Sequence, residues 1–175
     1  MVIAMIRAVG AALMIFGASA WGAFGVLKLS GRVRAFSAIC SALGEIRGEI
    51  CCKMTPLPEM LERLSKTASF PADALFRRAS KKLPKLGRAT FGEIWREAVE
   101  ESPELLLRGE EKTALSALGS TLGHYDAQVQ EREIDYLSRR FESFLREADE
   151  EKKRDSKMYA ALGVASGVFC VIILL

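Results

Sequence analysis

Side chains that could act in catalysis are few in this chain. His124 is the single histidine, and no serine or cysteine pattern typical of a nucleophilic site lies near it. The histidine follows Gly123 at an expected corner between two helices, where a structural or solvent-facing role fits it better than catalysis. Glu100 and Glu101 are adjacent, so on a helix their side chains diverge by about 100° and cannot face one substrate as an acid–base couple.

Motifs for cofactors and metals are also absent from the sequence. There is no phosphate-binding loop of the G-x-x-x-x-G-K-S/T type and no paired-histidine zinc motif. The four cysteines have neither disulfide nor zinc spacing, because Cys40 is alone, Cys51 and Cys52 are adjacent, and Cys170 lies in an apolar run. We therefore expect no catalytic residue, cofactor or metal, although a small membrane-bound hydrolase that uses His124 stays open.

Two groups of charged residues are better candidates for binding. A basic patch lies on and after a short helix expected over residues 72–83, and an acidic face lies on the next helix. The patch could bind an acidic protein, anionic lipid or nucleic acid, or be a solvated face; no aromatic residue interleaves with it, which disfavours nucleic acid. We predict that one of the two groups contacts a protein partner: Arg77, Arg78, Lys81, Lys82, Lys85 and Arg88 in the basic patch, or Glu93, Glu97, Glu100 and Glu101 on the acidic face.

The elements that carry these groups lie between two apolar ends. Half of the 175 residues are hydrophobic, and the mean hydropathy of +0.13 is high for a soluble domain. The excess comes from residues 8–27 and 158–175, which carry no charge. Every charged residue except Arg7 lies between these runs, and the charges there nearly balance, which argues against bulk binding of nucleic acid.

Each apolar run is long enough to cross a membrane as a helix. Residues 158–175 would form a helix about 27 Å long, close to a hydrocarbon core of about 30 Å. We therefore predict a span at residues 1–28, one helical domain at 29–157 and a second span at 158–175. Small residues that would let the membrane helices pack closely are Ala18 and Gly22 in the first span and Gly163 and Gly167 in the second.

Basic residues beside both runs predict the orientation. They follow the first run and precede the second, so the positive-inside rule places the domain in the cytoplasm and both termini outside. The flanking residues are Lys28, Arg32 and Arg34 on one side and Lys152, Lys153, Arg154 and Lys157 on the other.

An alternative interpretation concerns the first run. Ala18, Ser19 and Ala20 match a signal-peptidase site, and cleavage there would leave a secreted helical binding domain with a C-terminal anchor. The apolar run continues to Leu27, however, and only Arg7 precedes it, so we favour an uncleaved span. A mature protein that begins at Trp21 would identify the alternative.

Apolar periodicity and turn residues predict helices throughout the middle of the chain. A helix over residues 29–52 continues the first span, and Gly44 and Gly48 on it either permit close helix packing or are merely tolerated. Thr55 is expected to cap the next helix, with Pro56 at its first position. Phe70 and Pro71 then interrupt the chain before the helix over residues 72–83.

The second half of the middle has clearer helix boundaries. Thr90 and Glu93 have capping-box spacing and open a helix that buries Ile94, Trp95, Ala98 and Val99 and ends at Ser102–Pro103. A further helix is expected over residues 105–122, followed by a corner at Gly123 and a cap at Asp126. The last helix carries apolar residues at three-and-four spacing: Ile134, Leu137, Phe141, Phe144, Leu145 and Ala148.

No segment alternates in polarity as a strand would. The fold class that we predict is all-α, a cytoplasmic bundle of about six helices flanked by an N-terminal and a C-terminal transmembrane helix. The loops between the helices are mostly short, so neighbouring helices should pack antiparallel.

Several short motifs also follow one another along nearly the whole chain. They are Leu43 and Glu49, the turn at residues 55–59, Leu61 to Leu64, Trp95, Leu118–Gly119, Leu122–Gly123, Asp126, Gln130, Lys157 to Tyr159, Leu162–Gly163 and Gly167. In this order they resemble the stage III sporulation protein AB family of spore-forming bacteria. Tyr125 departs from the pattern, where a small polar residue would be expected.

The resemblance implies a role that composition does not. Members of this family look like the cytoplasmic helical domain of the inner-membrane F component of type II secretion systems. The resemblance implies a non-enzymatic platform in a channel-like complex between mother cell and forespore. It implies as partners a cytoplasmic secretion-type ATPase of the same operon and other membrane subunits, no nucleic acid, and a homo-oligomer as an option. The domain would lie in the mother-cell cytoplasm, held by the outer forespore membrane.

Overall fold

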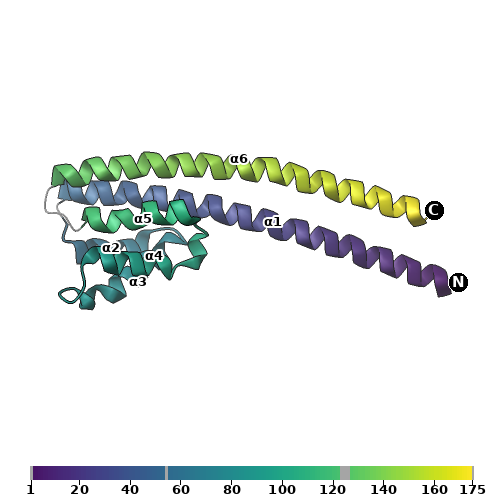
Figure 1. The fold of residues 1–175 in the computed structure, drawn as a ribbon, viewed down its shortest axis with the longest axis horizontal. Helices are drawn as coiled ribbons and strands as arrows, with labels where there is room; N and C mark the ends of the chain where they lie inside the picture. Colours follow the sequence, from purple (N-terminus) through teal and green to yellow (C-terminus); the bar gives the residue numbers. More distant parts are fainter. Residues whose placement is uncertain (1, 54, 123–126, 175) are drawn as a thin grey trace. The chain divides into compact units, whose positions relative to one another are not determined.

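The computed structural model describes residues 2–53, 55–122 and 127–174 (Figure 1). Side chains are described for residues 25–51, 55–122 and 128–159 and at a few positions beyond them. These residues form helices and turns, with one isolated bridge between Leu86 and Ala89 and no strand among them, so the all-α class is confirmed. Among the residues whose side chains are described, no helix is long and apolar enough to span a membrane.

The described helices follow one another with short connections. They divide between two compact units, Met1–Ser30 with Ala148–Leu175, and Gly31–Glu147. The long helices α1 and α6 contribute to both units, whereas α2 to α5 belong to the second. The helices are α1 (Val2–Gly48), α2 (Leu57–Thr67), α3 (Ala72–Lys82), α4 (Phe91–Glu100), α5 (Gly109–Leu122) and α6 (Ala127–Leu174).

Three expected helix ends differ from the observed ones. The α-helical part of the first helix ends at Gly48, and Glu49–Lys53 continue it as a wider π-helical turn. Thr55 does not cap α2, for which Pro56 is the N-cap residue without a side-chain bond. The Thr55 hydroxyl instead donates to the buried Glu49 carboxylate at 2.6 Å, and Arg63 donates to the same carboxylate at 2.8 Å.

The third difference is at the start of α5. This helix begins at Gly109 rather than at residue 105. Pro103–Leu105 form a separate 3₁₀ turn, and Leu106 then adopts a left-handed conformation with φ 52°. A left-handed residue cannot continue a right-handed helix, so α5 has to start further along the chain.

The capping box of α4 is confirmed. The backbone N–H of Glu93 donates to the Thr90 hydroxyl at 3.3 Å, and the backbone N–H of Thr90 donates to the Glu93 carboxylate at 2.8 Å. That second bond, followed by the Thr90 hydroxyl, holds the pKa of Glu93 below its ordinary value. The predicted inward residues Ile94, Trp95, Ala98 and Val99 are all buried.

Aromatic side chains hold the core of the unit Gly31–Glu147. Phe36 of α1 packs against Phe141 and Phe144 of α6, with ring centroids 6.2 and 6.0 Å apart. Trp95 of α4 lies 5.7 Å from the ring of Phe76 on α3. The predicted apolar face of α6 is confirmed, because Ile134, Leu137, Phe141 and Ala148 are buried. Phe144 and Leu145 on the same face are partly buried.

Helices α4 and α5 approach each other at a glycine. A Cβ added to Gly119 would lie 2.6 Å from Trp95 Cβ, well inside the normal contact distance of about 3.5–4 Å. The Trp95 indole N–H donates to the carbonyl of Leu115 at 2.8 Å, which ties the ring to α5. Gly44 and Gly48 of α1 have open space where a Cβ would be, which favours tolerance over close packing.

Candidate partner-binding surface

Parts of the basic patch and the acidic face contact each other. Lys82 at the end of α3 forms ion pairs with Glu97 at 2.7 Å and with Glu101 at 2.8 Å. Lys85 adds a second contact to Glu97 at 3.3 Å. These four residues therefore join α3 and its following turn to α4, and much of their charge is neutralised within the bundle.

The pKa values of this cluster agree with the geometry. Partial burial lowers the pKa of Lys82, but its hydrogen bonds to Glu101 and Glu97 outweigh that effect and raise it above the ordinary value. The bonds from Lys82 and then Lys85 lower the pKa of Glu97. Both shifts favour the charged forms, as expected for ion pairs.

Two other residues of the basic patch also have partners. Arg77 pairs with Asp73 one turn earlier on α3 at 2.6 Å. Arg78 donates to the hydroxyl of Ser102 at 3.0 Å and pairs with Glu104, which ties α3 to the turn after α4. Reversing the charge of Arg78 would therefore break a contact within the fold as well as change the surface charge.

Three of the predicted charges remain available at the surface. Lys81, Arg88 and Glu100 are exposed, and none of their side chains makes a hydrogen bond or ion pair with the described residues. The assignment of both groups to partner binding stays a prediction. The structure reduces the number of candidate contact residues to these three, because a partner could bind them without breaking a contact within the bundle.

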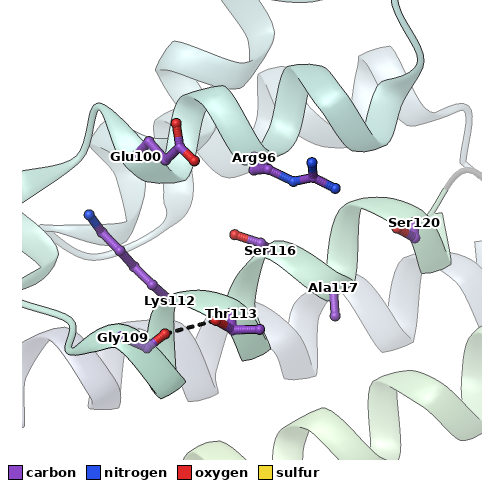
Figure 2. A pocket seen from close by; sticks show the side chains of 8 residues that line it. All are labelled: Arg96, Glu100, Gly109, Lys112, Thr113, Ser116, Ala117 and Ser120. Carbon is purple, nitrogen blue, oxygen red and sulfur yellow. Dashed lines mark hydrogen bonds between the residues drawn. The ribbon is translucent and has the colours of Figure 1, made fainter.

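Glu100 also lines a groove between α4 and α5 with a volume of about 500 Å³. Figure 2 shows Arg96 and Ser120 toward one end of this α4–α5 groove, Glu100 and Lys112 toward the other, and Ser116 between them. The Thr113 hydroxyl donates to the Gly109 carbonyl at 2.9 Å, so it already has an acceptor. The residues that line the groove are Arg96, Glu100, Gly109, Lys112, Thr113, Ser116, Ala117 and Ser120.

Arg96 and Lys112 are the cations that sequence reasoning missed. They lie on different helices, and neither side chain forms an ion pair among the described residues. The only sign of them in the sequence was one basic residue among the glutamates of each helix, Arg96 on α4 and Lys112 on α5. Their proximity depends on how α4 packs on α5 through Trp95 and Gly119, which no local pattern reveals.

A buried ion pair was also missed. Arg32 of α1 and Glu111 of α5 pair at 2.8 Å, with side chains 7% and 8% exposed. Arg32 also donates to the Leu106 carbonyl at 2.8 Å, while Glu111 accepts from the backbone N–H of Arg108 at 2.5 Å. The structure thus gives Arg32, read from the sequence only as a charge flanking the first span, an internal role that joins α1 to the start of α5.

Adjacent acids diverge in two places, as expected from the sequence for Glu100 and Glu101. Glu111 turns inward to Arg32, whereas Glu110 pairs with Arg140 of α6 at 2.7 Å. Glu101 pairs with Lys82, whereas Glu100 lines the groove. No group of metal-binding side chains occurs among the described residues.

Several predicted residues lie outside the residues that the structure describes. His124, Gly123, Tyr125 and Asp126 fall in the gap at 123–126, and the surroundings of four further positions are not described. These are the four proposed for packing between membrane spans, Ala18, Gly22, Gly163 and Gly167.

One sequence family matches nearly the whole chain. The sequence model of stage III sporulation protein AB matches residues 7–175. The chain is similar to a solved structure described as stage III sporulation protein AB (SpoIIIAB), with a TM-score of 0.63 and 24% identity over 71% of this chain and 98% of that one. At this identity the structural likeness shows the fold alone. No curated protein matches the chain.

Proposed function

Because the chain belongs to the stage III sporulation protein AB family, we propose that it is a non-enzymatic membrane platform subunit of a sporulation complex. Membership supports a sporulation-related role. The observation that carries the finer proposal is that the family match runs from residue 7 to residue 175. It therefore includes both uncharged runs together with the helical bundle between them.

The proposed platform is held at both ends by the membrane. Residues 8–27 and 158–175 carry no charge, and a run of about 18 apolar residues suffices for a span. The exposed Lys28 and Arg34 after the first run and Lys153 and Lys157 before the second favour a cytoplasmic bundle. In this proposal the membrane is the outer forespore membrane and the bundle lies on the mother-cell side.

The proposed partner is a cytoplasmic secretion-type ATPase. Lys81 on α3 and Arg88 after it are charged residues without partners among the described residues. The ATPase could contact them without breaking an interaction within the fold. Helices α1 and α6 each run without interruption from an apolar end of the chain into the bundle unit. In this proposal they carry force or position from the docked ATPase to the membrane and to other subunits of a channel-like complex.

Co-purification from sporulating cells tests the proposal. The tagged full-length chain should stay with membranes after alkaline carbonate and bring down the ATPase after detergent extraction. Lys81→Glu with Arg88→Glu should reduce the recovered ATPase several-fold, because neither side chain supports the fold. Arg132→Glu with Arg139→Glu, two exposed residues of α6, is the matched control for net charge.

Three results would contradict the proposal. Release of the chain by carbonate would remove the membrane anchor, and a mature N-terminus at Trp21 would favour the secreted alternative. ATPase recovery that is equal for both charge-reversed variants would remove the basic patch as the docking site.

A further inference from the structure

The α4–α5 groove gathers charges that the rest of the bundle does not neutralise. Many charged side chains elsewhere in the bundle have partners, such as Lys82 with Glu97 and Arg140 with Glu110. Arg96 and Lys112 both line the same hollow and form no ion pair or hydrogen bond among the described residues, although Arg96 lies close enough to Glu93 to add to the effect of Thr90 in lowering the pKa of that carboxyl. With Glu100 as the one acidic residue of the lining, the two cations leave the groove with a net positive charge that attracts an anionic group.

The donors of the groove fit a carboxylate. Arg96 and Ser120 lie toward one end, and Ser116 lies between them and the other end (Figure 2). A guanidinium binds a carboxylate through two parallel N–H bonds, and serine hydroxyls can donate to the same oxygens. Since none of these three side chains makes a hydrogen bond within the described residues, no existing bond must break when a ligand binds.

The other end of the groove favours a peptide over a bare anion. Glu100 lies there with Lys112, and its carboxylate would repel phosphate or the backbone of a nucleic acid. An acceptor beside a donor suits the N–H and C=O groups of an extended segment. The volume of about 500 Å³ is that of a small ligand site and holds a few residues rather than a folded domain.

We propose that the α4–α5 groove binds a short segment of a partner protein, with an Asp or Glu side chain of that segment held by Arg96. The inference rests on the proposed function only in taking the partner to be a protein. It does not require that partner to be the ATPase, and a defined peptide tests it without any other subunit.

The experiment measures binding of a short fluorescent peptide with one central glutamate to the full-length chain in detergent, by fluorescence anisotropy. Its counterpart with glutamine should bind about tenfold more weakly or worse, which corresponds to losing one good charged contact. Arg96→Glu should abolish binding, and Lys112→Glu should weaken it. Arg139→Glu on α6, which carries the same change in charge, should bind as the natural chain does.

A second variant separates the groove from general electrostatics. Ser116→Trp leaves the net charge unchanged but fills the groove, so it should also abolish binding. Thermal unfolding of each variant, followed by circular dichroism, confirms that the fold is kept. Failure of the natural chain to bind the glutamate peptide, or equal binding by Arg96→Glu, would overturn the proposal. Binding of inorganic phosphate with the same dependence on Arg96, and no preference for the peptide, would overturn it too.

Discussion

The contact of Gly119 with Trp95 allows a sharp test of how α4 and α5 pack. In Gly119→Ala the new methyl group would lie 2.6 Å from Trp95 Cβ and 2.8 Å from Trp95 Cδ1. Trp95 is fully buried, and its N–H is bonded to Leu115 at 2.8 Å, so it cannot turn aside without losing that bond. The two helices must therefore separate.

The expected cost follows from two opposing effects. Overpacking a core by one methyl group costs about 1–3 kcal/mol, and straining the buried indole hydrogen bond adds up to about 1 kcal/mol. Replacing a helical glycine by alanine returns about 1 kcal/mol. We expect a net loss of about 2 kcal/mol in the free energy of unfolding, or a fall of about 4–8 °C in Tm.

The assay is thermal unfolding of the full-length chain in detergent, followed by circular dichroism. Gly92→Ala is the matched control, because its Cβ would lie 3.5 Å from Ser120 Oγ, an ordinary contact. That variant should be as stable as the natural chain or slightly more so. If Gly119→Ala were no less stable than Gly92→Ala, the packing of α4 on α5 described above would be wrong.

Three further predictions concern the polar contacts, all read from the same unfolding assay. Glu111→Gln should cost about 3–5 kcal/mol by leaving Arg32 buried without its anion, whereas Arg32→Met with Glu111→Leu should recover most of that loss. If the losses of the two single substitutions simply added in the double variant, the pairing would be contradicted. Thr90→Ala should cost about 1 kcal/mol through loss of the α4 cap, and no loss would argue against the capping box. Lys82→Met should destabilise at neutral pH. That difference should shrink as pH falls below about 4.5, the ordinary pKa of Glu97, and a difference independent of pH would exclude the ion pair.

The sign of the pH effect follows from the two shifts. The pKa of Glu97 is lowered in the fold, so its contribution is present above its ordinary pKa and is lost as pH falls through the lowered value. The pKa of Lys82 is raised, so its contribution is complete below its ordinary pKa and is lost as pH rises through the raised value. The Lys82–Glu97 pair is therefore fully effective at neutral pH.

Local signals in the sequence predicted much of the fold. Thr90 and Glu93 are three residues apart, so the capping box could be recognised from spacing alone. The apolar faces of α4 and α6 could be read in the same way, because helical periodicity places their residues on one side. Thr55 misled the same reasoning, because its hydroxyl bonds to the buried Glu49 rather than to the start of α2.

Contacts between distant segments could not be predicted. Arg32 and Glu111 are 79 positions apart, and beside an apolar run Arg32 has the pattern of a membrane-flanking charge. Arg96 and Lys112 become neighbours of one groove only when α4 packs on α5. The ion pairs of Lys82 likewise require the turn between α3 and α4, so two surfaces that were separate in the sequence partly neutralise each other.

Cys51 offers a direct way to measure the orientation of the bundle, on which the proposed platform depends. Cys51 is exposed, whereas Cys40 is partly covered, and burial, followed by the nearby Glu142, raises the pKa of the Cys40 thiol to about 11. A full-length variant with Cys51 as its single cysteine is treated with a membrane-impermeant maleimide in spheroplasts and in inverted membrane vesicles. We predict labelling in the inverted vesicles and none in the spheroplasts. Labelling of intact spheroplasts would place the bundle outside the cytoplasm and contradict the platform.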